Sequence, residues 1–244
     1  MEYSQWNGFK QAEFDFEGRS ATLVFPKEAN ASRNWTLKTE YKDAFPETEI
    51  ALLEKGFHVA YLKNTSRLAP KEDCDAKAAF ASYLSKEFNL SKKCVLIGMS
   101  CGGAHAVRFA GFYPQLIDCM FIDAPVLNYC DFPGKIGRED LINPWENEFL
   151  KTYPGMTRAK LLDFKHHPIN MVDILIENKI PVLMLYGTED KVVSYNENGA
   201  LMEEAYKNHQ DLIRIIKREN EGHHPHGFPE NPEIIVDFIL KNIN

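Results

Sequence analysis

Short apolar runs alternate along this chain with longer stretches in which apolar residues recur every three or four positions. The short runs predict buried strands, and the longer stretches predict helices that pack against them on one side. Residues 94–97 (Cys-Val-Leu-Ile) are apolar throughout, which is typical of a central parallel strand covered on both faces. The pattern predicts strands at residues 57–62, 94–97, 118–123, 181–186 and 212–217, and helices at residues 43–55, 72–88, 102–112, 171–178, 195–207 and 230–241.

Two segments depart from this alternation. Residues 13–17 and 20–25 are strand-like and flank the turn Gly18-Arg19, which predicts a hairpin at the edge of the sheet. Residues 128–170 are rich in Pro, Gly and aromatic residues and contain short helical pieces at 143–152 and 157–164. We therefore expect one α/β domain over residues 1–244, with a mostly parallel sheet, an antiparallel N-terminal edge, helices on both faces and a small, lid-like helical insertion at about 128–170.

Composition excludes several classes of partner. The 244 residues include 28 Lys and Arg against 35 Asp and Glu, which gives a formal charge of −7. A nucleic-acid or anionic-membrane surface needs clustered positive charge, so neither partner is expected. The five cysteines form no CxxC pair, which favours a reducing compartment over a disulfide framework. Because no signal peptide begins at Met1 and no window of about 18 apolar residues exists, we expect a cytoplasmic protein.

A candidate nucleophile stands between the strand at 94–97 and the helix at 102–112. Gly98-Met-Ser-Cys-Gly102 matches G-x-S-x-G, and this motif requires a strand before it and a helix after it. Glycines at both ends allow a turn so tight that it lifts Ser100 above the sheet, at the positive end of the helix. The backbone N–H of Cys101 can then stabilise an oxyanion. The alternative is a plain strand-to-helix turn that binds a phosphate or nothing.

A serine nucleophile needs a base that accepts its proton and a carboxylate that orients the base. In this topology the order along the chain is Ser, acid, His. Asp190 follows the strand at 181–186 and is the predicted acid. Its neighbour Glu189 and Asp123, at the end of the preceding strand, are the alternatives.

Three histidines compete for the role of base after the strand at 212–217. His223 directly follows a glycine in the loop between the last strand and the last helix, so it is the preferred base, and His226 and then His224 are the alternates. The spacing of these histidines could also chelate a metal ion, but a zinc site would need further ligands from elsewhere in the chain. No metal and no organic cofactor are expected.

Several motifs together resemble those of bacterial α/β-hydrolases that act as carbohydrate or sialate O-acetylesterases. The segments that carry the resemblance are Gly98–Gly103, Asp123–Val126, Tyr186–Val193, Gly222–Gly227 and Ala51–Val59. The resemblance implies the α/β-hydrolase fold, with Ser100 as nucleophile, Asp190 as acid and His223 as base. It also implies that the loop at 34–38 approaches the site, with Trp35 as the second oxyanion donor and Lys38 at the substrate pocket.

These observations predict a serine esterase that removes short acyl groups, above all acetyl, from a small molecule such as an acetylated saccharide. Trp145 and Phe149 either narrow the acyl pocket or simply pack the insertion onto the body of the protein. A peptidase or thioesterase with the same three residues is the alternative enzyme, since the residues determine the mechanism but not the leaving group. The alternative outside catalysis is a silent hydrolase-fold protein that binds a ligand. A monomer or a homodimer is expected.

Overall fold

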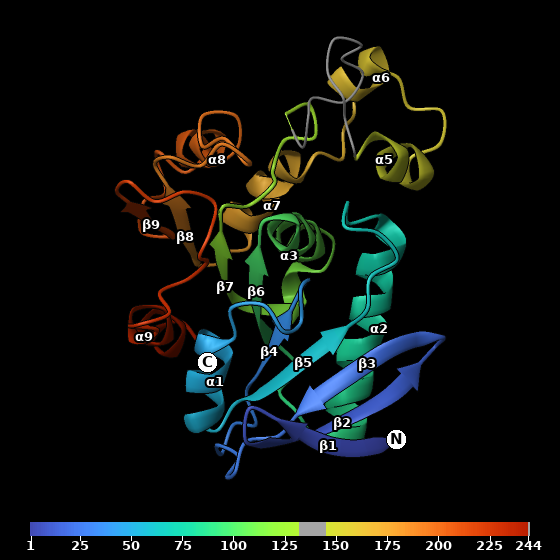
Figure 1. Cartoon of the computed structure of the whole chain (residues 1–244), viewed down its shortest axis with the longest axis vertical. Coiled ribbons are helices and arrows are strands. Elements are labelled where there is room, and N and C mark those ends of the chain that lie inside the picture. Colours follow the sequence, from blue (N-terminus) through green and yellow to red (C-terminus); the bar gives the residue numbers. More distant parts are fainter. Residues whose placement is uncertain (132–144, 244) are drawn as a thin grey trace.

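The computed structural model describes residues 1–131 and 145–243. These residues form one sheet in the order β1-β2-β3-β5-β4-β6-β7-β8-β9 (Figure 1). Its strands are β1 (Glu2–Trp6), β2 (Phe9–Phe16), β3 (Arg19–Val24), β4 (Trp35–Lys38), β5 (His58–Leu62), β6 (Cys94–Met99), β7 (Ile117–Asp123), β8 (Val182–Gly187) and β9 (Ile213–Arg218). Strands β1, β2, β3 and β5 pair antiparallel, and every later pair from β5 to β9 is parallel. The predicted α/β-hydrolase architecture with an antiparallel N-terminal edge is confirmed.

Helices cover both faces of the sheet. They are α1 (Glu47–Glu54), α2 (Lys71–Phe88), α3 (Cys101–Phe112), α5 (Glu146–Thr152), α6 (Arg158–Leu162), α7 (Val172–Glu177), α8 (Gly199–Ala205) and α9 (Glu233–Lys241), with 3-10 turns η1 (Pro114–Leu116) and η2 (Pro168–Met171). One apolar cluster joins the sheet to α2, α3 and α7, and a second joins it to α1 and α9. Every residue of β6 and β7 is buried, as the apolar runs predict.

Strand β4 was not expected, because we predicted residues 34–38 to be a loop. The strand lies between β5 and β6 in the middle of the sheet and is buried along its whole length. Thr36 and Lys38 alternate with Trp35 and Leu37, so the segment lacks the apolar run that marks its neighbours. The sequence pattern therefore misses a central strand that buries two polar side chains, of which Lys38 forms an ion pair with Glu49.

The predicted insertion at 128–170 contributes α5, α6 and η2, while its residues 132–144 lie outside the described part of the chain. Helices α5 and α6 lie beyond the carboxyl ends of β6 and β7 (Figure 1). Phe149 and Leu161 from these helices pack with Tyr129 and with Cys101 of α3 in a separate apolar cluster. This contact brings the two helices next to the nucleophile turn, and their action as a lid stays a prediction. Across the described ranges, no helix is both long enough and apolar enough to span a bilayer.

Candidate active site

Ser100 occupies the sharp turn between β6 and α3. Its backbone has φ 54° and ψ −119°, a conformation that costs roughly 1–3 kcal/mol in a residue other than glycine. The turn is so tight that a Cβ at Gly98 would lie 2.5 Å from the carbonyl oxygen of Gly102. The N–H of Ser100 donates to the carbonyl of Asp123 at 2.9 Å, and its carbonyl accepts from the N–H of Val126 at 3.0 Å. Hydrogen bonds from the loop after β7 therefore hold the strained turn in place.

The structure brings Ser100, His223 and Asp190 into one line of hydrogen bonds. The Ser100 Oγ lies 3.1 Å from His223 Nε2, and His223 Nδ1 lies 2.7 Å from Asp190 Oδ2. Asp190 comes from the loop after β8, and His223 comes from the loop after β9. Neighbouring parallel strands end at the same edge of the sheet, and this brings together residues that are up to 123 positions apart.

The environment of Asp190 keeps it ionised. Burial alone would raise the pKa of this carboxyl group, but the hydrogen bond from His223 and those from two backbone amides hold the pKa below its ordinary value. The amides belong to Val192 and Val193 and lie 2.8 Å and 2.9 Å from Asp190 Oδ1. One carboxylate oxygen is thus fixed by the backbone, which leaves the other free to orient the imidazole and to stabilise its positive charge.

Asp123, the alternative acid, lies in a different set of contacts. It is completely buried, and Oδ1 accepts a hydrogen bond from Arg218 at 2.9 Å. Its Oδ2 accepts one from the backbone N–H of Gly227 at 2.6 Å and lies 3.4 Å from Nδ1 of His226. The geometry thus pairs Asp123 with His226 and Asp190 with His223. Glu189, the other alternative, uses its backbone N–H to bind the carbonyl of Glu221.

The two alternate bases also line the site. His224 is exposed and its ring stacks on Phe45, with centroids 5.6 Å apart. His226 is buried, and its ring meets that of His223 edge to face, with centroids 4.8 Å apart. Of the three rings, that of His223 accepts the hydrogen bond of the Ser100 hydroxyl, at Nε2. Among the described residues, these three histidines form a group whose potential ligand atoms lie within 4.8 Å of one another.

Cys101, the predicted oxyanion donor, is the first residue of α3. Burial raises the pKa of its thiol to about 11, so the side chain stays protonated near neutral pH and is a poor nucleophile. Its thiol is hydrogen-bonded to the side chain of Tyr41. The backbone N–H of Cys101 is therefore the group that remains available for chemistry at the positive end of the helix.

The expectation that Trp35 is the second oxyanion donor is wrong. Trp35 begins β4, and the next residue, Thr36, pairs with Val95 near the start of β6, whereas Ser100 follows the end of β6. Its indole N–H donates to the carbonyl of Ser91 at 2.9 Å, at the opposite end of the strand. The residue that sequence reasoning missed is Tyr41, which lies in the turn after β4 with φ 55° and lines the same pocket as Ser100. Recognising 35–38 as a strand parallel to β6 would have pointed to the residues after it.

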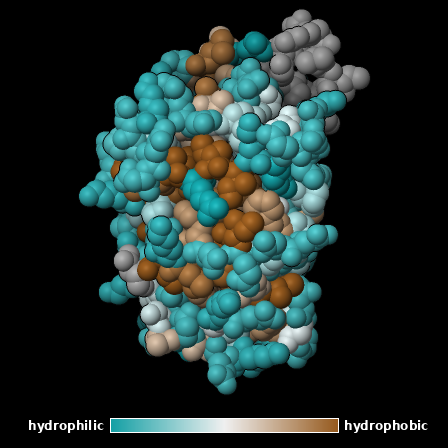
Figure 2. Space-filling view, turned by 90° about the vertical axis from the view of Figure 1, so that its left-hand side faces the viewer, coloured by the Kyte–Doolittle hydropathy of each residue, from teal (hydrophilic) through white to brown (hydrophobic). Residues whose placement is uncertain are grey.

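A pocket of about 280 Å³ opens in front of Ser100. On the side of β8, β9 and α9 the surface is mostly hydrophilic but carries an apolar area near its centre (Figure 2). The pocket combines apolar walls with the polar groups of the site, and its lining consists of Tyr41, Ala44, Phe45, Met99, Ser100, Cys101, Trp145, Val192, His223, His224 and His226.

Of the three residues predicted at the pocket, Trp145 lines it and the other two do not. Phe149 is fully buried between Tyr129 and Tyr153, so it packs the insertion onto the body of the protein. Lys38 is also buried, and its Nζ donates to Glu49 at 2.6 Å. The expectation that Lys38 meets the substrate is wrong, because an ion pair with α1 holds the lysine within the protein.

Arg67 holds Trp145 at the pocket. The guanidinium carbon of Arg67 lies 3.4 Å from the centroid of the indole ring of Trp145, so the electron-rich face of the ring attracts the positive charge of the arginine. Arg67 Nε also donates to both carboxylate oxygens of Glu148, at 3.1 Å and 3.2 Å. The loop before α2 and the start of α5 are thereby joined beside the pocket.

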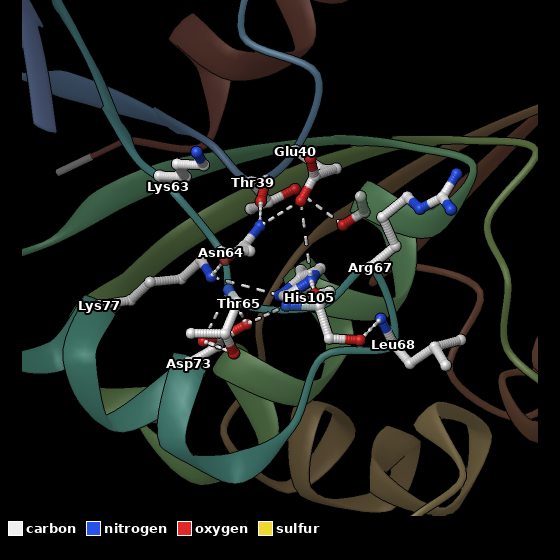
Figure 3. Close-up of polar contacts among 12 residues, drawn as sticks. Thr39, Glu40, Lys63, Asn64, Thr65, Arg67, Leu68, Asp73, Lys77 and His105 are labelled. Atoms are coloured by element: carbon white, nitrogen blue, oxygen red, sulfur yellow. Dashed lines mark hydrogen bonds and ion pairs between the residues drawn. The ribbon is translucent and has the colours of Figure 1, made fainter. Parts of the chain in front are cut away.

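Behind the nucleophile turn, a buried polar network reaches the residues that follow β4 (Figure 3). The Thr39 hydroxyl lies 2.7 Å from the carbonyl oxygen of Gly102, and the Asn64 side chain donates to the Thr39 carbonyl at 2.7 Å and to Glu40 at 2.5 Å. Lys77 donates to Asn64 from the other side. The network therefore connects β4 to the first turn of α3.

His105 completes this network from α3. Its Nε2 lies 2.9 Å from the carbonyl oxygen of Ser66, and its Nδ1 lies 3.2 Å from Nζ of Lys77. Burial, and next the charge of Lys77, hold the pKa of His105 well below its ordinary value. A neutral ring that donates from Nε2 and accepts at Nδ1 satisfies both contacts. His105 thus supports the helix that carries the nucleophile without reaching the pocket.

Comparisons with known proteins agree with this geometry. The model of the prolyl oligopeptidase family matches residues 54–244. A comparison with curated proteins found no match. Among solved structures, the S-formylglutathione hydrolase of Agrobacterium tumefaciens is 14% identical with a TM-score of 0.71, over 100% of this chain and 99% of that one. Est1E of Butyrivibrio proteoclasticus is 15% identical with a TM-score of 0.66, over 99% of this chain and 98% of that one.

The dipeptidyl peptidase 4 of Porphyromonas gingivalis is also similar in structure, with 14% identity and a TM-score of 0.72. The match covers 98% of this chain but 36% of the peptidase, so this chain spans little more than a third of that protein. At these identities the likeness shows a shared fold, in esterases and peptidases alike. The sequence resemblance is confirmed for the α/β-hydrolase superfamily, and the O-acetylesterase activity stays a prediction. Because the family match covers most of the chain, this protein belongs to the prolyl oligopeptidase family, within the α/β-hydrolases.

Proposed function

We propose that the protein is a serine esterase that removes short acyl groups, above all acetyl, from hydroxyl-bearing carriers such as carbohydrates. The observation that carries the proposal is the line of hydrogen bonds from Ser100 through His223 to Asp190, which opens into a small pocket. The choice of acetyl and of a carbohydrate carrier is supported by the sequence resemblance to O-acetylesterases.

In the first half of the reaction, His223 Nε2 accepts the proton of Ser100 while Oγ attacks the ester carbonyl carbon. Asp190 holds the Nδ1–H of the ring and stabilises the imidazolium that forms. The developing oxyanion accepts hydrogen bonds from the backbone N–H of Cys101 and from a second donor in the turn after β4, to which we assign the N–H of Tyr41. One such donor contributes about 3 kcal/mol to transition-state stabilisation. The imidazolium then gives its proton to the departing alcohol.

In the second half, water attacks the acyl group on Ser100. His223 accepts a proton from the water and returns it to the serine oxygen as the carboxylic acid leaves. The tetrahedral intermediate uses the same oxyanion donors in both halves. Apart from the ester and the water, each step needs only side chains and backbone amides of this chain. The net reaction converts an ester and a water molecule into an acid and an alcohol.

The size and polarity of the pocket support an ester with a small acyl group. Its volume of about 280 Å³ is close to the lower limit of the roughly 300–1,000 Å³ that is typical of ligand pockets. Trp145 forms part of the wall, and Arg67 and Glu148 hold that wall in position. A long acyl chain would have to displace this contact.

A peptidase is the second candidate, and the family match favours it. A peptide N-terminus or a basic side chain is cationic and is best bound by a carboxylate. Among the described residues that line the pocket, none is Asp or Glu. This absence favours a neutral acyl group over a charged peptide end.

Turnover of matched substrates tests the proposal. We expect kcat/KM for p-nitrophenyl acetate to exceed that for p-nitrophenyl octanoate by at least about 10-fold. The reason is that one methylene group that the pocket cannot accommodate costs about 1–3 kcal/mol of transition-state binding. Release of acetate from an acetylated oligosaccharide tests the carrier, and acetyl thioesters and peptide p-nitroanilides test the alternatives. Ser100→Ala is the control and should lower kcat by about 10⁶-fold. Faster cleavage of the anilide, or a folded protein in which a fluorophosphonate leaves Ser100 unmodified, would contradict the proposal.

A further inference from the structure

A second pair of imidazole and carboxylate stands beside His223 and Asp190. His226 is 3% exposed, and its Nδ1 lies 3.4 Å from Oδ2 of the fully buried Asp123. In the His223 pair the corresponding distance is shorter, with Nδ1 hydrogen-bonded to Asp190 Oδ2 at 2.7 Å. Both rings line the pocket in front of the serine. The reaction proposed above uses one of these pairs and leaves the other without a role.

A carboxylate at Nδ1 is the arrangement that prepares a histidine to bind a metal ion. Metal-ligating histidines donate one ring N–H to a carboxylate or carbonyl group, which leaves the lone pair of the other nitrogen free for the ion. In His223 the free nitrogen is Nε2, which lies 3.1 Å from the Ser100 hydroxyl. His226 Nδ1 lies 3.4 Å from Asp123 Oδ2 and is buried without a hydrogen-bond partner in the described part of the chain, so this ring also has a nitrogen that no hydrogen bond uses.

His224 supplies a third imidazole at the open side of the pocket. Its ring centroid lies 4.7 Å from that of His223 and 4.9 Å from that of His226. The potential ligand atoms of the three residues lie within 4.8 Å of one another. Two nitrogens on a tetrahedral ion at about 2.0–2.1 Å lie about 3.3 Å apart, so rotation of exposed His224 and small shifts of the other rings close the site. Asp190 and Asp123 behind the rings offset the charge of a dication.

We propose that His223, His224 and His226 bind a divalent transition-metal ion of the class that prefers imidazole, and that this ion inhibits the enzyme. Three neutral imidazoles suit Zn²⁺, Ni²⁺ and Cu²⁺, whereas Mg²⁺ and Ca²⁺ prefer oxygen ligands. The bound ion occupies the Nε2 lone pair of His223, so this nitrogen no longer accepts the proton of Ser100. The binding half of this inference stands without the proposed function, and the inhibition half rests on it.

Zinc binding is measured first, in a protein that cannot turn over. Isothermal titration of Ser100→Ala with ZnCl₂ should give one site with a dissociation constant of about 1 µM or below. Ser100→Ala/His224→Ala should bind at least about 10-fold more weakly, since a lost partner at a metal site costs 10–100-fold. Ser100→Ala/His209→Ala is the matched control, because His209 is an exposed histidine outside the cluster, and it should bind as Ser100→Ala does. Equal affinities in all three variants would overturn the site, and so would an equal response to MgCl₂.

Inhibition is measured second, on the wild-type protein. Zn²⁺ at about ten times its dissociation constant should slow fluorophosphonate labelling of Ser100 by about 10-fold, and EDTA should restore the rate. Unchanged labelling of a protein that binds Zn²⁺ at the three histidines would overturn the inhibition. Failure of labelling without any metal would instead count against the esterase proposal, while the titration would still decide the metal site.

Discussion

Replacement of Gly187 by alanine should lower the activity about 10²-fold without altering a catalytic side chain. Gly187 ends β8, and a Cβ at this position would lie 2.3 Å from the carbonyl oxygen of Glu221 and 2.4 Å from that of Gly222. These two carbonyl groups directly precede His223. Ordinary contact begins at 3.4 Å, so the loop must move by about 1 Å (3.4 − 2.3). The Glu221 carbonyl also accepts a hydrogen bond from the N–H of Glu189 at 2.8 Å, and a shift of the loop would strain this bond.

A shift of this size acts on a hydrogen bond that is already 3.1 Å long between His223 Nε2 and Ser100 Oγ. A misplacement of about 1 Å in a reacting group costs about 10²-fold in rate. We expect kcat/KM of Gly187→Ala for p-nitrophenyl acetate to fall by about that factor. Overpacking of this kind also destabilises the fold by about 1–3 kcal/mol. Thermal unfolding then establishes that the variant is assayed in its folded state.

Gly222→Ala is the matched control for this experiment. It lies in the same loop, next to His223, but its added Cβ meets nothing within 4 Å. Its kcat/KM should stay close to that of the wild type, and the rate of fluorophosphonate labelling of Ser100 should separate the two variants in the same way. Wild-type activity in folded Gly187→Ala, or equal losses in the two variants, would refute the steric argument.

Four further variants test the electrostatics and the packing. Asp190→Asn should lower kcat by about 10⁴-fold, because Asp190 is hydrogen-bonded to His223. Asp123→Asn should lower kcat far less, because Asp123 contacts Arg218 and not His223. Equal losses of kcat in the two variants would contradict this pairing. Thr39→Val removes the buried hydroxyl behind the nucleophile turn and should lower the free energy of unfolding by about 1–2 kcal/mol in a urea titration, while an unchanged midpoint would contradict it. Burial, and next the charge of a nearby arginine, lower the pKa of His58 to about 4, so between pH 6.5 and pH 4 the unfolded chain binds a proton that the folded one does not. The free energy of unfolding should therefore fall by about 1.4 kcal/mol for each unit by which the pH is lowered in this window. Between pH 7 and pH 5, His58→Gln should lose about 2 kcal/mol less of this free energy than the wild type. Parallel plots of unfolding free energy against pH for the two proteins would contradict the assignment to His58.

The order of the elements around the site follows from the sequence because the apolar runs correspond to strands, of which β6 and β7 in the middle of the sheet are buried on both faces. Residues 94–97 and 118–123 become β6 and β7, in which every side chain is buried. The loops after β6, β8 and β9 carry Ser100, Asp190 and His223 in the order expected. Adjacent parallel strands end at one edge of a sheet, so strand order alone brings such residues near one another.

The errors concern polar residues that the structure buries. The sequence resemblance implies Lys38 at the pocket, yet its Nζ lies 2.6 Å from Glu49 with both side chains 1% exposed. A buried lysine requires a partner that the fold brings close to it, and a pattern of apolar positions cannot identify that partner. The same reason hides β4, in which Lys38 and Thr36 occupy buried positions. The misplaced donor Trp35 follows directly from the missed strand.

The choice between His223 and His226 depends on distances that the sequence does not reveal. Each ring lies near a carboxylate, but Nδ1 of His223 is 2.7 Å from Asp190, whereas Nδ1 of His226 is 3.4 Å from Asp123 and has no hydrogen-bond partner among the described residues. Asp123, however, also accepts a hydrogen bond from Arg218 at 2.9 Å in a buried position, and the guanidinium offsets its charge. Asp190 is bound by neutral amides, so its charge remains available to the imidazolium that forms during the reaction. Asp190 orients the ring of His223, and Nε2 of that ring lies 3.1 Å from the Ser100 hydroxyl; these two contacts favour His223 as the base.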